Sequence, residues 1–385
     1  MGERLFREFK WFHENPELSY EEAGTTGRIR EFLEGEGIEI LECALETGLV
    51  AVIRGGKPGG VQALRCDIDG LPVREETGLS YASKIPGKMH ACGHDFHIAA
   101  GLGCACLLQE RREELAGVVK LVFQPGEETS LGALKVLETG VMEDVEQIWG
   151  LHADPTNETM AVGLREGYVA AAVDRFVVKV KGAGCHGAHP DDGIDPVPAA
   201  CAMVQAFQTI VTRNINPFHP ALVSVTRIQA GNTWNVIPSE AELEGTVRTM
   251  SRADRELFER RIEEIAASTA RAYGAQASLQ WIPGPPAVSN DGRMSALASE
   301  TAGRLGLCVV EEEQSMGGDD FSFYETYGRE IPGCYIKIGT GIGPTIHQPG
   351  FCVDPAALLP AAEYLAEVIL AAAGKEIEGN PEGTF

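Results

Sequence analysis

The chain has 385 residues, of which 44% are hydrophobic, and a globular chain of this length is expected to form two domains rather than one hydrophobic core. It carries 32 Lys and Arg against 56 Asp and Glu, a net charge of −24, which argues against nucleic acid or an anionic membrane as a partner. Its ten cysteines are too sparse for a disulfide scaffold, and since no signal peptide or apolar run of membrane-spanning length is predicted, a cytoplasmic location fits best.

Helical and strand patterns alternate along the first part of the chain. Helices are predicted at 3–13, 20–36 and 95–114, and strands at 38–43, 48–54, 61–66, 118–123 and 146–151. Such alternation is typical of an α/β fold, in which helices cover a mostly parallel central sheet.

The pattern changes near Val173. The next predicted elements are a strand at 175–181, a helix at 196–212, strands at 221–228 and 241–249, a helix at 252–273 and a strand at 275–282. This β-α-β-β-α-β order is that of a ferredoxin-like α+β domain, and a Pro-rich linker follows it. We therefore predict an inserted domain at 173–284 within a catalytic domain formed by 1–172 and 285–385, where helices at 293–305 and 355–373 and a strand at 334–338 are expected.

The segment 90–97 combines three histidines with Cys92 and Asp95. Imidazole and thiolate together suit zinc and similar metals, and Cys92 and His94 are two residues apart, so both can face one ion. By itself the segment is also compatible with a polar loop that holds a buried thiol.

Three further segments favour the metal interpretation. Glu127 and Glu128 follow the predicted strand 118–123, at the strand end where open α/β sheets place their sites. Adjacent side chains point in different directions there, so one can bind a metal while the other faces a water. His152 follows the predicted strand 146–151, and His347 lies in a Gly- and Pro-rich loop. Either histidine alone is compatible with a structural role, but the four segments together predict a metal site.

Several motifs follow one another in the order of a known family. They are HENPELS at 13–19, RCDIDGLP at 65–72, KMHACGHD at 88–95, QPGEE at 124–128, GLH at 150–152, NVIP at 235–238, GTVRT at 245–249 and DFSFY at 320–324. In these motifs the chain resembles the M20 metallopeptidases of subfamily D. That subfamily consists of amidohydrolases that include hippurate hydrolases, N-acyl-amino-acid deacylases and plant auxin-conjugate hydrolases.

The resemblance implies a zinc-peptidase-like catalytic domain with two divalent metal ions per subunit. The implied ligands are Cys92, His94, Glu128, His152 and His347. Zinc or manganese is expected, and mixed ligation of this kind also admits cobalt or nickel. The inserted domain is implied to be a lid that carries the contact of a homodimer.

Other residues receive supporting roles from the same resemblance. Glu127 is implied to be the general base and acid. Asp67 and Asp69 are implied to hold a ligand imidazole by its other nitrogen, although Asp at a strand end also stabilises turns.

Substrate-binding residues are implied as well. His186 matches a lid histidine that reaches an active site, often across the dimer, to stabilise an oxyanion. Asn235 and Arg248 match residues that recognise a substrate carboxylate, for which the planar guanidinium of Arg is suited. Gly341 lies in a Gly-rich stretch before His347 that lets the backbone approach the substrate. Structural alternatives are a turn histidine for His186 and a surface charge for Arg248.

The predicted function is metal-dependent hydrolysis of the amide bond of N-acyl amino acids, such as hippurate-like or N-acetyl conjugates. A metal-bound water activated by Glu127 would release a carboxylic acid and a free amino acid. A dipeptidase or an N-acetyl-diaminopimelate deacetylase on the same site is the nearest alternative. A non-catalytic metal or thiol sensor is a third alternative, but a sensor needs ligands and no base, so Glu127 favours catalysis.

Overall fold

The computed structural model describes residues 1–373 and divides the chain into two compact units. Unit 1 consists of Met1–Val169, Ser289–Glu313 and the described part of Asp320–Phe385, and unit 2 of Ala170–Val288 and Gln314–Asp319. Each unit has its own cluster of buried apolar side chains. The assignment of 173–284 as a lid or dimerisation domain stays a prediction.

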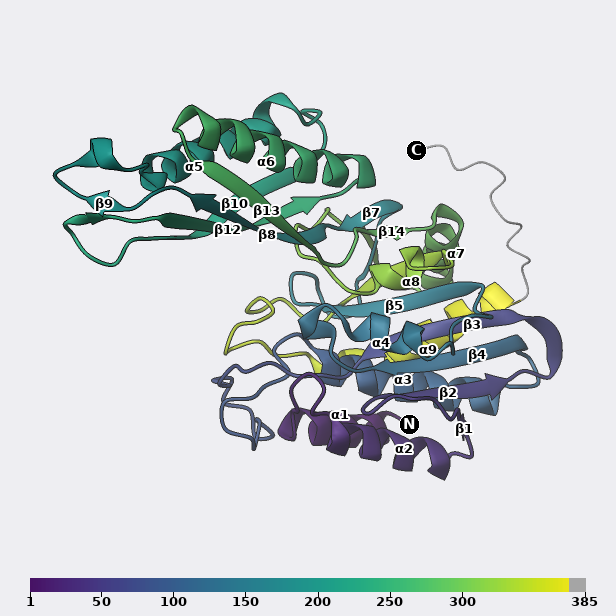
Figure 1. The fold of residues 1–385 in the computed structure, drawn as a ribbon. Coiled ribbons are helices and arrows are strands. Elements are labelled where there is room, and N and C mark those ends of the chain that lie inside the picture. Colours follow the sequence, from purple (N-terminus) through teal and green to yellow (C-terminus); the bar gives the residue numbers. More distant parts are fainter. Residues whose placement is uncertain (374–385) are drawn as a thin grey trace. The chain divides into compact units, whose positions relative to one another are not determined.

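Unit 1 is built on one eight-stranded sheet with the order β1-β2-β4-β3-β5-β16-β6-β15 (Figure 1). Its strands are β1 (Glu39–Ile40), β2 (Leu49–Arg54), β3 (Lys57–Asp67), β4 (Ala116–Gln124), β5 (Gln147–Asp154), β6 (Val162–Leu164), β15 (Val309–Glu311) and β16 (Gly333–Gly339). The four central strands β4, β3, β5 and β16 are mutually parallel, whereas β1, β2 and the β6–β16 pair are antiparallel. This confirms the predicted α/β fold with a mostly parallel central sheet.

The helices of unit 1 match most of the predicted ones. They are α1 (Gly2–Glu14), α2 (Ala23–Gly35), α3 (His94–Glu110), α4 (Gly132–Glu138), α7 (Gly292–Arg304), α8 (Ser322–Thr326) and α9 (Leu358–Ala373), with 3-10 turns η1 (Glu127–Thr129) and η3 (Pro355–Ala357). The short elements α4, α8, β6 and β15 had no clear sequence pattern.

Helix α3 is buried on almost every side. A side chain at Gly101 would lie 2.5 Å from the Cys66 sulfur of β3, and one at Gly103 would lie 2.6 Å from Ala362 of α9. The two glycines therefore let α3 fit closely between the sheet and α9, as buried apolar helices require. This packing fixes the N-terminus of α3, which begins at His94.

The segment Pro355–Ala373 is long and apolar enough by composition to cross a membrane, so the expectation that no apolar run reaches this length was wrong here. In the structure it is a core helix: Leu358, Tyr364 and Leu365 are at most 2% exposed, and α9 packs on α3 and α7. Burial within the core of unit 1 accounts for its apolar composition.

Unit 2 contains a four-stranded antiparallel sheet with the order β10-β12-β8-β13. Its elements are β8 (Ala172–Lys181), β9 (Cys185–His186), η2 (Pro190–Asp192), α5 (Pro196–Arg213), β10 (Ala221–Ala230), β11 (Val236–Ile237), β12 (Glu240–Thr249), α6 (Arg252–Ala272) and β13 (Gln276–Pro283). The main elements follow the predicted β-α-β-β-α-β order. Two short strands, β7 (Gly167–Ala170) and β14 (Val288–Asn290), lie where the chain passes from one unit to the other.

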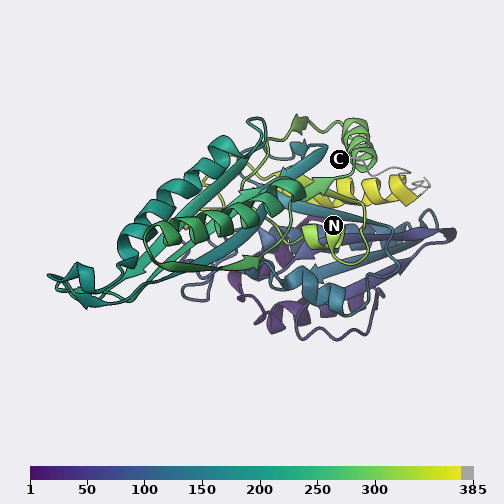
Figure 2. The same cartoon turned by 45° about the horizontal axis from the view of Figure 1, so that its top comes forward.

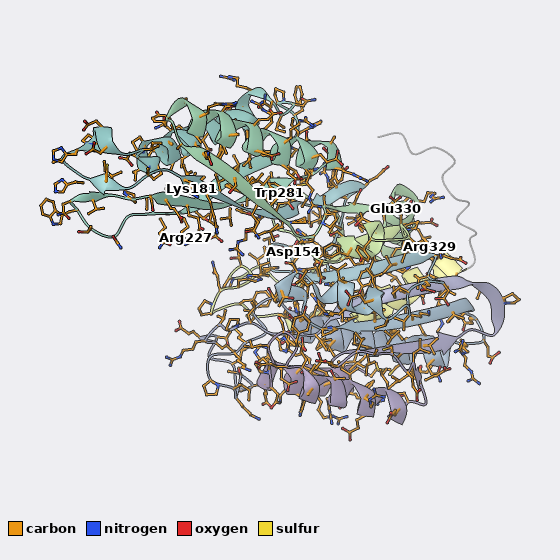
Figure 3. All side chains as sticks on the ribbon, viewed as in Figure 1. Asp154, Lys181, Arg227, Trp281, Arg329 and Glu330 are labelled. Atoms are coloured by element: carbon orange, nitrogen blue, oxygen red, sulfur yellow. The ribbon has the colours of Figure 1, made fainter. Side chains whose placement is uncertain are left out.

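The two faces of this sheet differ. Helices α5 and α6 lie side by side and pack on one face (Figures 1 and 2), and the buried residues of β12 alternate along the strand as this packing requires. The other face carries charged side chains, among them Lys181 and Arg227 (Figure 3).

Candidate metal centre and active site

The candidate site of unit 1 forms where the central parallel strands end. Asp67 is the last residue of β3, Glu127 and Glu128 lie in η1 just after β4, and His152 lies near the end of β5. The carboxyl ends of parallel strands meet at one edge of a sheet, so residues far apart in the sequence come together there. Helix α3 adds His94 from its first turn. His152 was expected to follow its strand but lies inside it, because β5 extends to Asp154.

The predicted metal ligands form one cluster. Ligand atoms of Cys92, Glu128 and His347 all lie within 4.8 Å of one another, as do those of His94, Glu127 and Glu128. His347 Nε2 is 3.6 Å from Glu128 Oε1, and His152 Nε2 is 3.5 Å from the Cys92 sulfur. The two groups share Glu128.

Hydrogen bonds on the outer side of the cluster orient two of the imidazoles. His94 Nδ1 is 2.8 Å from the backbone oxygen of Asp69, and His152 Nδ1 is 2.8 Å from that of Ala153. A carbonyl oxygen accepts only, so each Nδ1 must carry a proton, and Nε2 is the nitrogen that is left to bind a metal once it is unprotonated. Imidazoles that bind metals are commonly held in this way.

The cluster also contains buried polar atoms that a cation would satisfy. His94 Nε2 and Glu128 Oε1 are buried and have no hydrogen-bond partner among residues 1–373. A buried polar atom left without a partner costs about 1–3 kcal/mol. Thiolate, imidazole and carboxylate donors are the ones that zinc and similar divalent metals use. The residues present therefore fit a metal site.

The charges of the cluster agree with this fit. Burial raises the pKa of the Cys92 thiol. Burial also raises the pKa of Glu128, and the negative charges of Asp69 and Asp67 add to this shift. Without a cation, both groups are thus held towards their protonated forms, which bind metals poorly. A bound cation would favour the thiolate and the carboxylate.

Asp69 organises this part of the chain. Its carboxylate accepts hydrogen bonds from the backbone N–H groups of Glu127 and Glu128 at 3.1 and 3.0 Å. Its backbone oxygen accepts a hydrogen bond from His94 Nδ1. Burial raises the pKa of Asp69, but the hydrogen bond with His94 and the other donors outweigh it and lower that pKa. Asp69 thereby links the two carboxylates of η1 to a predicted metal ligand.

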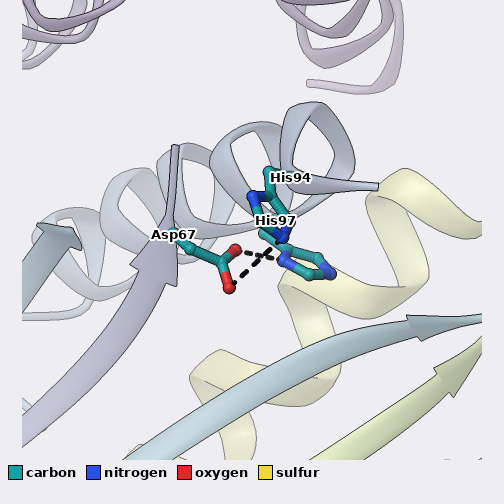
Figure 4. A group of neighbouring side chains, drawn as sticks. All are labelled: Asp67, His94 and His97. Carbon is teal, nitrogen blue, oxygen red and sulfur yellow. Dashed lines mark hydrogen bonds and ion pairs between the residues drawn. The ribbon is translucent and has the colours of Figure 1, made fainter. Parts of the chain in front are cut away.

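Asp67 has a different partner, His97, which is drawn with it and His94 in Figure 4. Asp67 accepts a short hydrogen bond from His97 Nδ1, and His97 Nε2 accepts the N–H of Ala153 at 2.8 Å. Although these three side chains could surround an ion, both nitrogens of His97 are already in use, so we interpret them as support. His97 was not among the predicted site residues; its position three residues after His94 on one helix is the only signal in the sequence.

A buried arginine holds Asp67 in place. Arg65 is fully buried and pairs with Asp67, with Asp320 at 2.8 Å and with the side-chain oxygen of Gln124 at 3.0 Å. Tyr324 donates to the same Gln124 oxygen at 2.9 Å. Burial raises the pKa of Asp67, but Arg65 and the neighbouring histidines outweigh it and hold that pKa well below its usual range. These contacts bring the motifs 65–72, 124–128 and 320–324 together.

The predicted substrate-binding residues are spread over both units. Gly341 belongs to unit 1 and has a φ of +92°, which favours glycine. His186, Asn235 and Arg248 belong to unit 2. His186 pairs with Val236 between β9 and β11, the backbone oxygen of Asn235 accepts the N–H of Gly187 at 2.8 Å, and Arg248 donates to the Met316 oxygen at 3.2 Å. Their roles towards a substrate stay predictions.

Comparisons with known proteins give the family. Residues 63–371 match Peptidase family M20/M25/M40. The chain is 46% identical to N-acetylcysteine deacetylase of Bacillus subtilis (strain 168), over 95% of this chain and 96% of that protein. It is 38% identical to IAA-amino acid hydrolase ILR1-like 4 of Arabidopsis thaliana, over 85% of this chain and 75% of that protein.

A solved structure agrees with these relatives. The crystal structure of the Bacillus subtilis YXEP protein, described as a dinuclear metal binding peptidase from M20 family, has a TM-score of 0.89 and 44% identity, covering 97% of this chain and 98% of that chain. The predicted resemblance is therefore confirmed, and the chain belongs to peptidase family M20/M25/M40.

Proposed function

We propose that this protein is a metal-dependent amidohydrolase that cleaves the amide bond of N-acyl amino acids, as enzymes of subfamily D do. The observation that carries the proposal is the cluster in which His94 Nε2 and Glu128 Oε1 are buried without a hydrogen-bond partner in the described residues, directly beside Glu127. At the level of the reaction, the prediction agrees with the names of the relatives, which denote a deacetylase and an amino acid hydrolase.

Two divalent ions per subunit are supported by two observations. Two groups of donors share Glu128, and the similar YXEP protein is described as dinuclear. We propose Cys92, His94, Glu128, His152 and His347 as ligands and zinc or manganese as the ions. Bound divalent ions supply Lewis acidity towards a carbonyl oxygen and a water.

Glu127 is the proton carrier in this proposal. Its carboxylate takes a proton from the water that attacks the amide carbon, and it gives that proton to the nitrogen of the leaving amino acid as the C–N bond breaks. The acyl carbon receives the water oxygen, so the products are a carboxylic acid and an amine. Asp69 holds the backbone N–H of Glu127 and thereby positions this carboxylate.

The remaining predicted roles belong to the same proposal. His186 would stabilise the oxyanion, Asn235 and Arg248 would bind the substrate carboxylate, and the backbone at Gly341 would face the substrate. A homodimer formed through unit 2 and a cytoplasmic location complete it. Peptide cleavage is a second candidate, because the YXEP protein is described as a peptidase.

Amino-acid release from a panel of N-acyl amino acids and dipeptides tests this proposal. The protein is stripped of metal and reloaded with zinc or manganese. We expect release that requires metal and is faster from N-acyl amino acids than from dipeptides. Faster release from dipeptides would favour the peptidase, and metal binding without release from any compound would favour a sensor.

A further inference from the structure

The segment between α1 and α2 contacts the turn that carries Glu127 and Glu128. Tyr20 and Thr129 share a hydrogen bond of 2.8 Å between their hydroxyl groups. The N–H of Gly126 donates to Glu22 at 2.9 Å, and Ser19 donates to the Asp69 carboxylate at 2.7 Å. Ser19 ends the motif 13–19, for which the proposed reaction has no use.

The turn needs such support because its own secondary structure is minimal. Turn η1 is a single 3-10 turn of three residues. It lies between Gly126, with a φ of +67°, and Ser130, with a φ of +60°. Left-handed backbone is unfavourable for a residue with a side chain, such as Ser130. The position of Glu127 and Glu128 is therefore set by contacts from other parts of unit 1.

Tyr20 has the geometry of such a contact. Its aromatic ring lies so close to Gly126 that a side chain there would come within 2.5 Å of Tyr20 Cε1. With its hydroxyl group bonded to Thr129, the side chain spans the turn from the residue before Glu127 to the residue after Glu128. Asp69 holds the two N–H groups of the same turn.

Tyr20 itself has an unfavourable backbone. Its φ is +65°, which is rare for a bulky residue and costs free energy. Its side chain is 40% exposed, so core packing does not account for a tyrosine at this position. Strained residues of this kind persist where the surroundings hold them, and they concentrate at functional sites.

We propose that Tyr20 is a positioning residue that clamps the turn η1 and so fixes the carboxylates of Glu127 and Glu128. The effect on catalysis rests on the proposed function, since it requires Glu127 to be the proton carrier. The clamp on the turn is a property of unit 1 and can be measured whether or not the protein hydrolyses amides.

Three variants of Tyr20 distinguish the effect of its aromatic ring from the effect of its strained backbone. Tyr20→Phe removes only the hydroxyl group, Tyr20→Ala also removes the ring but keeps a side chain in left-handed backbone, and Tyr20→Gly removes both. Tyr327→Ala is the matched control, because Tyr327 is 53% exposed, has a φ of −92° and its ring contacts Phe323. Peptide-resolved hydrogen exchange measures the mobility of the turn, and thermal unfolding measures the effect of the backbone strain on stability. The kinetics of amide hydrolysis give kcat and KM.

The clamp predicts faster hydrogen exchange across 126–130 in Tyr20→Ala and Tyr20→Gly, with metal content unchanged. It predicts that kcat falls about 10- to 100-fold in both, as expected for a misplaced catalytic group, with little change in KM, and that Tyr20→Phe lies between them and the wild type. Tyr20→Gly should unfold at a higher temperature than Tyr20→Ala, because glycine adopts left-handed backbone freely, yet it should be no more active.

Unchanged hydrogen exchange in the turn of Tyr20→Gly, or a wild-type kcat in that variant, would overturn the clamp. An equal loss of kcat in Tyr327→Ala would overturn it too, because any lost surface ring would then have the same effect. A wild type that hydrolyses no amide would contradict the proposed function instead, and hydrogen exchange would still decide the clamp.

Discussion

Charged side chains are buried at the carboxyl end of the unit 1 sheet, whereas they are exposed on the open face of the unit 2 sheet. In unit 1, Arg65, Asp67 and Asp320 are fully buried, and Arg65 forms an ion pair with each of the two carboxylates. In unit 2, Arg227 pairs with Glu242 and Glu244 on the sheet surface while its own side chain stays 47% exposed. Buried charges need partners to avoid a large desolvation cost, whereas exposed pairs are solvated by water. The charges that are buried at this cost lie beside the candidate metal centre of unit 1.

Arg65→Met should have the largest effect on stability. It leaves Asp67 and Asp320 buried without their cation, and breaking a buried pair in this way typically costs about 3–5 kcal/mol. Because Arg65 helps to keep the pKa of Asp67 low, the variant should also lose less stability than the wild type as the pH falls below about 4. Urea unfolding at several pH values measures both effects. A free energy of unfolding equal to that of the wild type would contradict the role of this network.

His13→Gln should have the next largest effect, and that effect should depend on pH. His13 Nδ1 is 2.6 Å from Asp95 and its Nε2 is 3.2 Å from Glu75. Burial lowers the pKa of His13, but the hydrogen bonds to these carboxylates outweigh it and raise that pKa to about 10.

The raised pKa of His13 determines how its contribution to stability changes with pH. Since the pKa is higher in the folded state than the unfolded value of about 6.5, the charged histidine stabilises the fold fully below about pH 6.5 and progressively less up to about pH 10. His13→Gln should therefore cost about 3 kcal/mol near pH 6 and clearly less near pH 9.5. The control is His219→Gln in unit 2, because His219 pairs with one carboxylate, that of Asp254, and its own side chain is 45% exposed, so its loss should change stability much less. An effect of His13→Gln that stays constant with pH would contradict the assignment.

Arg227→Met should have the smallest effect. Its ion pairs with Glu242 and Glu244 lie on the surface, where water and salt weaken them. The change in the urea midpoint should be much smaller than for Arg65→Met and should shrink further at high salt. A loss as large as that of Arg65→Met would remove the contrast between the two regions.

The parts of the fold that were predictable from the sequence are those with strong local patterns. The buried strands β2 to β5 and the buried helix α3 show apolar runs, and helix α6 shows the periodicity of an amphipathic helix. Helix α4 was missed because its start depends on a distant contact: the N–H of Ala133 donates to Asp320 at 2.8 Å, and no local cap marks it. Strand β15 was missed because it has only three residues and gains its pairing from β6.

The residues of the candidate site likewise include some that were predictable from the sequence and some that were not. Residue types and spacing were enough to predict Cys92, His94, Glu127 and Glu128 as candidate site residues, because their chemistry is unusual for a fold, and the structure brings their ligand atoms close together. The supporting roles of His97, Arg65 and Tyr20 were not predicted, because these roles depend on partners between 30 and 255 residues away. The different places of Asp67 and Asp69, one bonded to His97 and one to the turn of Glu127, were likewise visible only in three dimensions.

The most direct test of the proposed reaction compares the wild type with Glu127→Gln. Gln has the size of Glu but cannot take up a proton, and Glu138→Gln, on the exposed end of α4, serves as the matched control. With equal metal content confirmed, we expect the rate of amino-acid release from an N-acyl amino acid to fall about 10²- to 10⁴-fold in Glu127→Gln and to stay unchanged in the control. Release at the wild-type rate, or loss of bound metal from Glu127→Gln, would contradict the role of Glu127 as the proton carrier.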